Sequence, residues 1–303
     1  MDWLILLVLL PMVLVPTVLI WGFAGCAAVY GVHHIDPPAQ PINLSAIPVI
    51  STQTGSAIQL TWENQAAFPV VIERAEDGGE FVRLKDASGN DLEVSGETFT
   101  DEGLDGGAIF IYQLFASSGG YLSDHPSDPA SAQTFKTAFL EANVVANMEQ
   151  PGTGGFTIVQ IINNSLLAAS GALKSLSLRG PTSGNLTLNK IYISNVAAIG
   201  DPYDSDVPPM LVVSDFVVNN DTVAAVPANM FFLDQTRPLL VAFDVNLTNG
   251  TMRNCMLTGG GVMSYAAGVT VPGQAVNQAG LQDRPSGYGP AAALYLIHKI
   301  EVA

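Results

Sequence analysis

Three carboxylates lie within a stretch of six residues in the second half of the chain, at Asp201, Asp204 and Asp206. Carboxylate oxygens are ligands that Ca²⁺ prefers, so this cluster is a candidate calcium site. Its spacing differs from that of the EF-hand loop, which also needs a central glycine and a distal glutamate. Aspartate, proline, serine and glycine, which make up most of the segment, favour ordinary turns as well. The residues alone leave both a calcium site and a simple turn open.

Histidine and cysteine, which commonly bind metals or act in catalysis, are few in this chain. Cys26 and Cys255 lie far apart in the sequence and show no metal-ligand spacing. The adjacent His33 and His34 could bind a metal or cofactor, and they also suit the polar edge of an apolar segment. His298 lies in a predicted strand, where we expect a structural role rather than that of a base. No cofactor is predicted, and calcium is the one metal that the sequence suggests.

The sequence lacks the motifs that mark common catalytic sites. It has no Gly-x-Ser-x-Gly turn, no phosphate-binding loop, no dinucleotide fingerprint and no His-Glu-x-x-His pair. We therefore expect a protein that is not an enzyme. Folding can bring distant carboxylates together, so a hydrolytic site in the second half of the chain stays open as an alternative.

An apolar segment begins the chain, because residues 3–32 contain no charged side chain. A helix that runs from Trp3 to Trp21 would be about 27 Å long, close to the thickness of a bilayer core. Tryptophan at both ends suits the membrane interface. The sequence therefore predicts a membrane anchor at residues 1–32, followed by a proline-rich spacer at residues 33–41.

The same segment offers a second mode of membrane attachment. Residues 23–26, Phe-Ala-Gly-Cys, resemble the lipobox of bacterial lipoproteins, in which the cysteine is lipidated after cleavage. The resemblance implies lipidation of Cys26, although Phe23 and the lack of an early Lys or Arg depart from the usual pattern. Both interpretations place residues 3–32 in contact with the lipid bilayer. Both predict a bacterial membrane-anchored protein whose remaining residues are periplasmic or extracellular.

Acidic residues outnumber basic ones, and the chain carries a net charge of −16 at pH 7. The excess is concentrated in residues 40–135, which hold 14 acidic and 3 basic side chains. A surface this acidic repels phosphate backbones, which argues against nucleic acid as a partner. Hydrophobic residues make up 48% of the chain and charged residues 13%, a composition too apolar for a disordered protein.

Residues 42–135 alternate apolar and polar side chains in short runs, as strands with one buried face do. The clearest runs are residues 57–62, 70–74, 81–84, 98–104 and 109–116. Their order, with Trp62 ending the first run and Tyr112 inside the last, resembles a fibronectin type III domain. The resemblance implies a sandwich of two sheets with both aromatic side chains in its core.

Residues 136–303 continue the all-β pattern with longer and more apolar runs. Strands are predicted at residues 156–162, 173–178, 186–193, 210–213, 238–245 and 293–302. The pattern loosely resembles jelly-roll-like β-sandwich modules of bacterial surface and phage proteins, a group that binds sugars or other proteins. This half has no tryptophan, which weakens a sugar-binding interpretation. A helix is predicted only near residues 136–148.

The sequence thus predicts an all-β, non-enzymatic protein in which a transmembrane helix precedes two sandwiches, one fibronectin type III-like and one jelly-roll-like. We expect it to serve as an accessory subunit of a membrane complex or as a surface scaffold or adhesion component. Its expected partners are other membrane or surface proteins. The alternative is a carbohydrate-binding or hydrolytic module carried by residues 137–303. The sequence contains no Arg-Gly-Asp tripeptide to support integrin-type adhesion.

Overall fold

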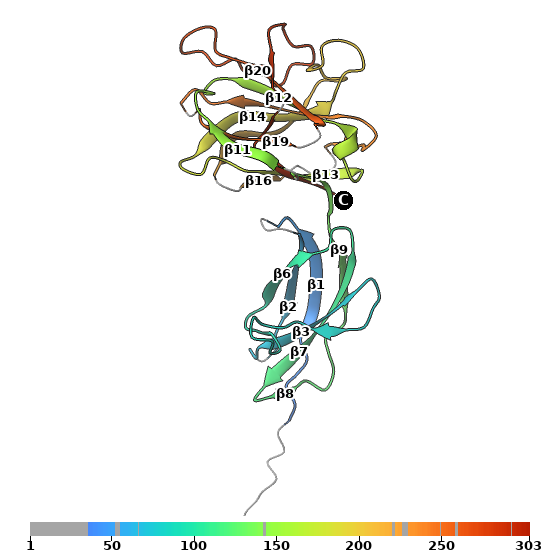
Figure 1. Cartoon of the computed structure of the whole chain (residues 1–303). Coiled ribbons are helices and arrows are strands. Elements are labelled where there is room, and N and C mark those ends of the chain that lie inside the picture. The colour runs from blue at the N-terminus through green and yellow to red at the C-terminus, as the bar shows by residue number, and fades with distance from the viewer. Residues whose placement is uncertain are drawn as a thin grey trace, which may run out of the picture.

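The computed structural model describes residues 36–51, 55–65, 67–141, 144–219, 222–225, 230–248, 250–257, 260–291 and 293–303. These residues form two β-sandwiches, one above the other in Figure 1, and the all-β prediction is confirmed. The only helix among them is the short 3₁₀ helix η1, Asn164–Leu166. The described residues include no helix that is long and apolar enough to cross a bilayer. The predicted anchor at residues 1–32 and its Cys26 lie outside the described residues.

The first module contains two antiparallel sheets. One has the order β1-β2-β6, and the other has the order β4-β3-β7-β8 with β5 beside β3 and β9 beside β7. The strands are β1 Ile42–Val49, β2 Ser56–Glu63, β3 Val70–Glu76, β4 Val82–Arg83, β5 Glu93–Val94, β6 Thr98–Leu104, β7 Ile109–Ser118, β8 Tyr121–Leu122 and β9 Ala130–Gln133. The five predicted runs lie on β2, β3, β4, β6 and β7, and the module has a fibronectin type III-like fold.

The period-two pattern of these strands places one face of each sheet in a common core. Trp62 and Tyr112 are both buried there, as expected, with 3% and 0% of their surfaces exposed. The Tyr112 hydroxyl donates a hydrogen bond to Asp101 Oδ2 over 2.9 Å, and Arg74 forms an ion pair with the same oxygen at 2.8 Å. A buried hydroxyl needs such a partner, so Asp101 on β6 joins the two sheets through polar contacts as well.

The second module is a larger sandwich. Its outer sheet has the order β15-β14-β18-β12-β20-β21, and two smaller sheets with the orders β10-β23-β13-β16 and β11-β19-β22 form the facing layer. The strands are β10 Lys136–Leu140, β11 Val144–Gln150, β12 Thr157–Ile162, β13 Gly171–Leu178, β14 Leu186–Asn195, β15 Met210–Val218, β16 Thr222–Ala225, β17 Phe232–Leu233 (beside β13), β18 Leu239–Val245, β19 Met252–Leu257, β20 Val262–Ala267, β21 Gly289–Ala291, β22 Leu294–Tyr295 and β23 Ile297–Val302.

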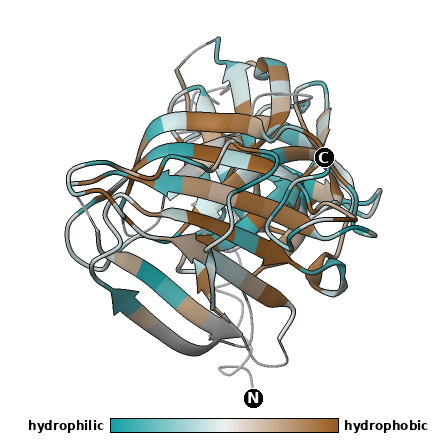
Figure 2. Ribbon diagram, turned by 90° about the horizontal axis from the view of Figure 1, so that it is seen from above, coloured by the Kyte–Doolittle hydropathy of each residue, from teal (hydrophilic) through white to brown (hydrophobic). Residues whose placement is uncertain are grey.

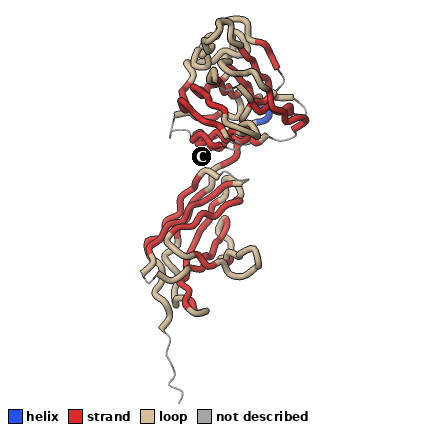
Figure 3. The backbone as a smooth tube through the Cα atoms, turned by 90° about the vertical axis from the view of Figure 1, so that its left-hand side faces the viewer, coloured by secondary structure: helices blue, strands red, loops and turns tan. Residues whose placement is uncertain are grey.

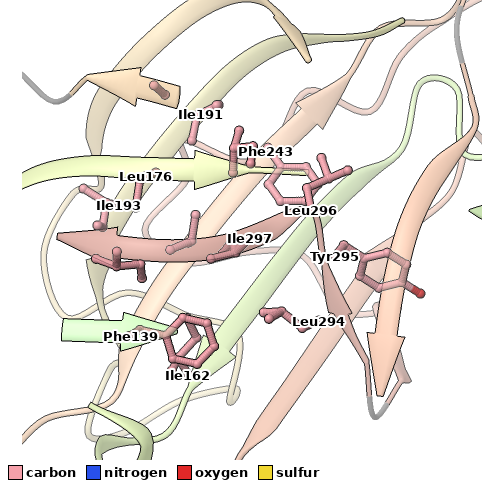
Figure 4. Close-up of a cluster of buried hydrophobic side chains, with 14 of the residues drawn as sticks. Phe139, Ile162, Leu176, Ile191, Ile193, Phe243, Leu294, Tyr295, Leu296 and Ile297 are labelled. Atoms are coloured by element: carbon pink, nitrogen blue, oxygen red, sulfur yellow. The ribbon is translucent and has the colours of Figure 1, made fainter. Parts of the chain in front are cut away.

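The core of this module lies between the two layers, where side chains such as Phe139, Leu176, Ile191 and Phe243 meet (Figure 4). All seven residues of β18 are buried, because its second face is covered as well. Hydrophobic residues accordingly cross several neighbouring strands when the second module is seen from above (Figure 2). Apolar contacts on both faces fix the central strand of the outer sheet firmly.

The predicted helix near residues 136–148 is wrong. Residues 136–140 form the strand β10, and residues 144–148 belong to the strand β11. Ala138 and Phe139 are buried in the core, and β10 pairs with the C-terminal strand β23. Tertiary pairing therefore overrides a weak local preference for helix. The C-terminal strand β23, which was predicted within residues 293–302, lies beside early strands of this module, because it pairs with both β10 and β13.

The two modules meet with almost no linker, since only residues 134 and 135 separate β9 from β10. Across this junction the ammonium of Lys299 donates to the carbonyl of Gly55 over 3.1 Å and pairs with Glu301 at 2.9 Å. The Ser175 hydroxyl donates to the second oxygen of Glu301 over 2.7 Å. The Lys299 and Glu301 side chains are 6% and 0% exposed, so a buried ion pair of the second module also holds the first.

Candidate functional site

A cavity of about 470 Å³ opens on the outer sheet of the second module, on the face opposite the core. We call it the polar cavity. Strands β12, β14 and β20 of this sheet lie on the side of the second module away from the first (Figure 1). The loop that joins β20 to β21, residues 268–288, forms one wall and is called the covering loop. The cavity is lined by Asn189, Lys190, Tyr192, Ser214, Asp215, Asp244, Asn277, Gly280 and Leu281.

A β-bulge in β14 supplies two adjacent polar residues to the cavity. The register against β18 runs from Leu188–Val245 to Lys190–Asp244, so Asn189 is an extra residue on its strand. Leu188 and Ile191 both point into the core, whereas Asn189 and Lys190 between them line the cavity. Strict alternation would have turned one of these two toward the core. The bulge therefore directs an amide and an ammonium to the same side of the sheet.

The neighbouring strand β15 repeats this pattern with Ser214 and Asp215 between the core-facing Val213 and Phe216. Asp215 has φ +51°, in the left-handed region that costs most residues conformational energy and that aspartate tolerates better than most. Outside the backbone pairing of the strands, the side chains of Lys190, Ser214 and Asp215 make no hydrogen bond or ion pair with another described residue. These three groups are therefore available to a ligand.

Asp244 on β18 supplies the buried carboxylate of the cavity, with 2% of its surface exposed. Its Oδ1 accepts hydrogen bonds from the Thr157 hydroxyl at 2.5 Å and from the backbone amide of Ala279 at 3.1 Å. Burial raises the pKa of Asp244, and these hydrogen bonds and nearby Lys190 oppose that rise without cancelling it. The strand register places the residue directly between Lys190 on β14 and Thr157 on β12.

The covering loop is held in place by buried polar contacts. The Arg284 guanidinium, in a residue only 4% exposed, donates to the Ala279 carbonyl at 2.6 Å and to the Tyr203 carbonyl at 2.5 Å. The Tyr203 ring stacks on Tyr288 with a centroid distance of 4.9 Å. The Tyr288 hydroxyl donates to Gln278 at 3.0 Å. Contacts within the protein thus hold this wall of the cavity in place.

The acidic segment predicted as a calcium site lies beside this loop and supports it. Asp204 accepts the Arg284 backbone amide on Oδ1 at 2.8 Å and the Asp201 amide on Oδ2 at 3.0 Å. Asp206 pairs with Arg237 at 2.6 Å. In the part of the chain that the structure describes, no three His, Cys, Asp or Glu side chains are grouped to hold a metal ion. The structure therefore does not bring Asp201, Asp204 and Asp206 together as a ligand set.

A second cluster brings together residue types that could act in nucleophilic catalysis. Glu141 Oε2 lies 3.2 Å from His298 Nδ1, and Cys255 is hydrogen-bonded to the same carboxyl group. His298 Nε2 faces the Arg179 guanidinium at 3.0 Å. Since a guanidinium only donates, Nε2 accepts and Nδ1 carries the proton that Glu141 accepts. Burial and nearby Glu141 raise the pKa of the Cys255 thiol to about 12.

This arrangement opposes a nucleophilic role. A thiol with so high a pKa is not ionised near neutral pH, and its thiolate is the reactive form. The adjacent cavity, bordered by Glu141, Arg253 and Leu294, has a volume of only about 10 Å³ and admits no substrate. His298 is a structural residue of its strand in this geometry. The adjacent His33 and His34 and the candidate lipidation site Cys26 lie outside the described residues.

The residues of the polar cavity were not predicted, although the sequence holds a signal for them. Two strands each carry a pair of polar residues between apolar ones, at Leu-Asn-Lys-Ile (188–191) and Val-Ser-Asp-Phe (213–216). Such a pair breaks period-two alternation and is typical of a bulge. Asp244 breaks no pattern, but it is the only charged residue in a strand that is otherwise apolar.

No protein-family model and no curated protein matches the chain. Several solved structures are similar to it. A Fn3-like protein from Clostridium thermocellum is 24% identical over 33% of this chain and 95% of its own, with a TM-score of 0.26. A two-domain fibronectin type III segment of chicken tenascin is 14% identical over 86% and 99%, with a TM-score of 0.24. Chitinase ChiA74 from Bacillus thuringiensis is 15% identical over 73% and 28%, with a TM-score of 0.23. These TM-scores are too low to assign a fold. The fibronectin type III-like fold of the first module is assigned from its strand order.

Proposed function

We propose that this protein is a non-enzymatic, membrane-anchored binding protein of the bacterial surface or periplasm. The first module acts as a spacer, and the second presents the polar cavity to a ligand. The observation that carries this proposal is the position of the cavity. It lies on the outer sheet, whose strands β12, β14 and β20 are on the side of the second module away from the first, while the described chain begins at the far end of the first module (Figure 1).

The junction between the modules supports a spacer role. A two-residue connection and the buried contact from Lys299 to Gly55 restrict the motion of one module against the other. The loops at the far end of the second module, drawn in tan in Figure 3, then stand at a fixed distance from the entry of the chain. A rigid pair of sandwiches suits a protein that must hold a binding surface away from a membrane.

Binding is favoured over hydrolysis by the layout of the charges. Hydrolytic carboxylate pairs act across open space that holds the substrate and a water molecule. Here Lys190 lies on the strand between those of Asp215 and Asp244. The Asp244 carboxylate is already engaged by Thr157 and Ala279. This arrangement favours a binding site in which the ammonium of Lys190 partly offsets the two carboxylates.

Two roles fit the proposal, a surface scaffold or adhesion component and an accessory subunit of a membrane complex. The proposal also includes a jelly-roll-like connection of the strands in the second sandwich. Detergent extraction followed by size-exclusion chromatography and native mass spectrometry separates the two roles. Co-elution with stoichiometric partners assigns the protein to a complex, and elution as a lone chain assigns it to the scaffold or adhesion role.

The anchor is tested by fractionating cells that express the full chain or a chain without residues 1–35. The full chain is expected in the membrane fraction, and the shortened chain should be released. A full chain recovered without detergent would contradict the proposal. Intact mass then separates the two modes of attachment, because an uncleaved anchor gives the full 31.8 kDa chain. Lipoprotein processing instead removes residues 1–25 and adds lipid to Cys26, and Cys26→Ser would release that form from the membrane.

A further inference from the structure

The polar cavity offers hydrogen-bond donors and acceptors in nearly equal measure. Lys190 and Tyr192 supply donors, Asp215 and Asp244 supply acceptors, and the Asn277 amide can do both. The Asn189 amide is fixed from two sides, because it accepts a hydrogen bond from Asn246 at 2.9 Å and donates one to Asn277 at 3.1 Å. A ligand that fits must therefore donate and accept several hydrogen bonds within one small volume.

Other ligand classes fit the cavity poorly. A phosphate or sulfate would meet the carboxylates of Asp215 and Asp244, and a divalent cation would meet the ammonium of Lys190. An apolar molecule would remove water from all of these groups without replacing their hydrogen bonds. Leu281 and the Tyr192 ring are the main apolar surfaces that it could contact.

We propose that the polar cavity binds a neutral polyhydroxylated ligand, a sugar unit of a glycan. This inference rests on the proposed function only in taking the second module as the binding module. A volume of about 470 Å³ lies within the usual range of small-molecule sites and is large enough for one or two sugar rings. Each sugar hydroxyl donates and accepts, which matches the alternation of ammonium, carboxylate and amide groups. The Tyr192 side chain supplies the aromatic surface that this tryptophan-free module otherwise lacks.

The bulge and the positive φ angle at the cavity support this assignment. The bulge at Asn189 and the left-handed Asp215 each turn a polar side chain outward at a cost in regular sheet pairing. Strained backbone that the fold maintains in a cavity is typical of binding sites. The covering loop is already held by Arg284, so binding requires little ordering of the chain.

The proposal is tested by titrating the full chain in detergent with glucose, galactose, mannose and N-acetylglucosamine, and with oligosaccharides derived from cellulose and chitin. Saturation-transfer NMR detects the bound sugar. Asp215→Asn is the central variant, because asparagine keeps the size of the side chain and tolerates the same left-handed conformation. We expect it to weaken binding about tenfold, as the loss of a charged hydrogen-bond partner does.

Lys190→Met keeps the aliphatic stem and removes the ammonium, so it should also weaken binding about tenfold. Asp128→Asn is the matched control, since Asp128 is exposed in the loop between β8 and β9 of the first module and is not part of the polar cavity. Unchanged thermal melting of each variant shows that the fold is intact. Binding neither to these saccharides nor to the insoluble polymers of the second arm, or equal binding by wild type and both cavity variants, would overturn the proposal.

A second arm identifies the source of the sugar. Co-sedimentation with insoluble cellulose, chitin and peptidoglycan measures binding to a polymer, and the titrations measure binding to free saccharides. Loss of co-sedimentation in Asp215→Asn, with free sugars inactive, assigns the site to a polymer. The reverse result assigns it to a soluble saccharide. Membrane fractionation is independent of both arms, so a missing anchor and a missing sugar site give different results.

Discussion

The ring of Tyr192 lies against the backbone of Gly280, so the covering loop approaches the outer sheet as closely as a glycine allows. A Cβ atom at position 280 would lie 2.6 Å from Cζ of Tyr192, well inside the normal contact distance. One residue of the loop therefore sets the position of this wall of the polar cavity. Larger side chains at this point would lift the loop or displace the ring.

Gly280→Ala should lower the free energy of unfolding by about 1–3 kcal/mol, the usual cost of an added methyl group in a closely packed site. Urea denaturation measures the change. Gly289→Ala is the control, because a Cβ there meets only the Ala266 carbonyl oxygen at 4.0 Å. Adding Tyr192→Leu to Gly280→Ala should restore part of the stability. Equal stability of Gly280→Ala and wild type would show that the loop is not closely packed.

The carboxyl group of Glu141 makes the stability of the second module depend on pH. Burial would raise its pKa, but hydrogen bonds from His298 and Cys255 and the charge of Arg179 outweigh this effect and lower the pKa. A carboxyl group with a lowered folded-state pKa stabilises the protein above its unfolded pKa. That contribution is lost as the pH falls through the lower, folded value.

Glu141→Gln should therefore cost about 1–3 kcal/mol near neutral pH, the range for a hydrogen-bonded charged group. The difference from wild type should shrink as the pH falls below about 4, where the unfolded carboxyl group takes up its proton. Urea denaturation of both proteins from pH 7 downward follows this difference. A difference that stays constant over the whole range would contradict the role of the charge.

At the scale of elements, the acidic segment at residues 201–206 packs as a turn beside the covering loop. Asp204 accepts backbone amides on both oxygens, and Asp206 faces Arg237. Carboxylates with these partners gain little from a cation, so removing calcium should not create repulsion between them. The segment acts instead through Arg284, which fixes the wall of the polar cavity.

Thermal melts with millimolar Ca²⁺ and with chelator should therefore give the same midpoint. A ligand that binds only the folded protein raises its melting temperature by mass action. Mg²⁺ at the same concentration controls for ionic strength. A higher midpoint in Ca²⁺ alone that disappears in Asp204→Asn would show that the carboxylates rearrange into a calcium site.

Several strands of the first module could be predicted because they alternate buried and exposed residues, β7 most regularly. The run 109–116 alternates so regularly that Tyr112 could be placed in the core from sequence. The outer sheet of the second module is covered on both faces around β18, and its composition shows apolar residues without alternation. Short strands such as β16 and β17 gain their structure from pairing with β13, which no local pattern records.

The polar cavity could not be predicted for a related reason. Its residues come from β14, β15, β18 and the covering loop, and strand pairing decides which of them meet. The polar pair at Asn189 and Lys190 signals a bulge, but its partner across the sheet, Asp244, is more than fifty residues away in sequence. The side-chain direction at a bulge depends on register, and register is set by the folded sheet.

At the scale of the whole molecule, the buried pair of Lys299 and Glu301 connects the stability of the second module to its contact with the first. Lys299 donates both to Glu301 and to the Gly55 carbonyl of the other module. A buried ion pair contributes little beyond an apolar pair of the same size, but removing one member leaves an uncompensated charge. Because the pair lies at the junction, substitutions of Lys299 and Glu301 can show how rigidly the two modules are joined.

Lys299→Met should lower the free energy of unfolding of the second module by about 3–5 kcal/mol, because Glu301 is then buried with Ser175 as its remaining partner. The double variant Lys299→Met/Glu301→Gln removes the stranded charge and should recover most of that stability, yet it still lacks the bond to Gly55.

If the hydrogen bond from Lys299 to Gly55 holds the modules in line, small-angle X-ray scattering of the double variant should show a wider spread of molecular lengths than wild type. Lys174→Met, on the same layer but without such a contact, should match wild type in both measurements. A double variant with wild-type scattering would mean that the short connection at residues 134–135 alone keeps the modules aligned.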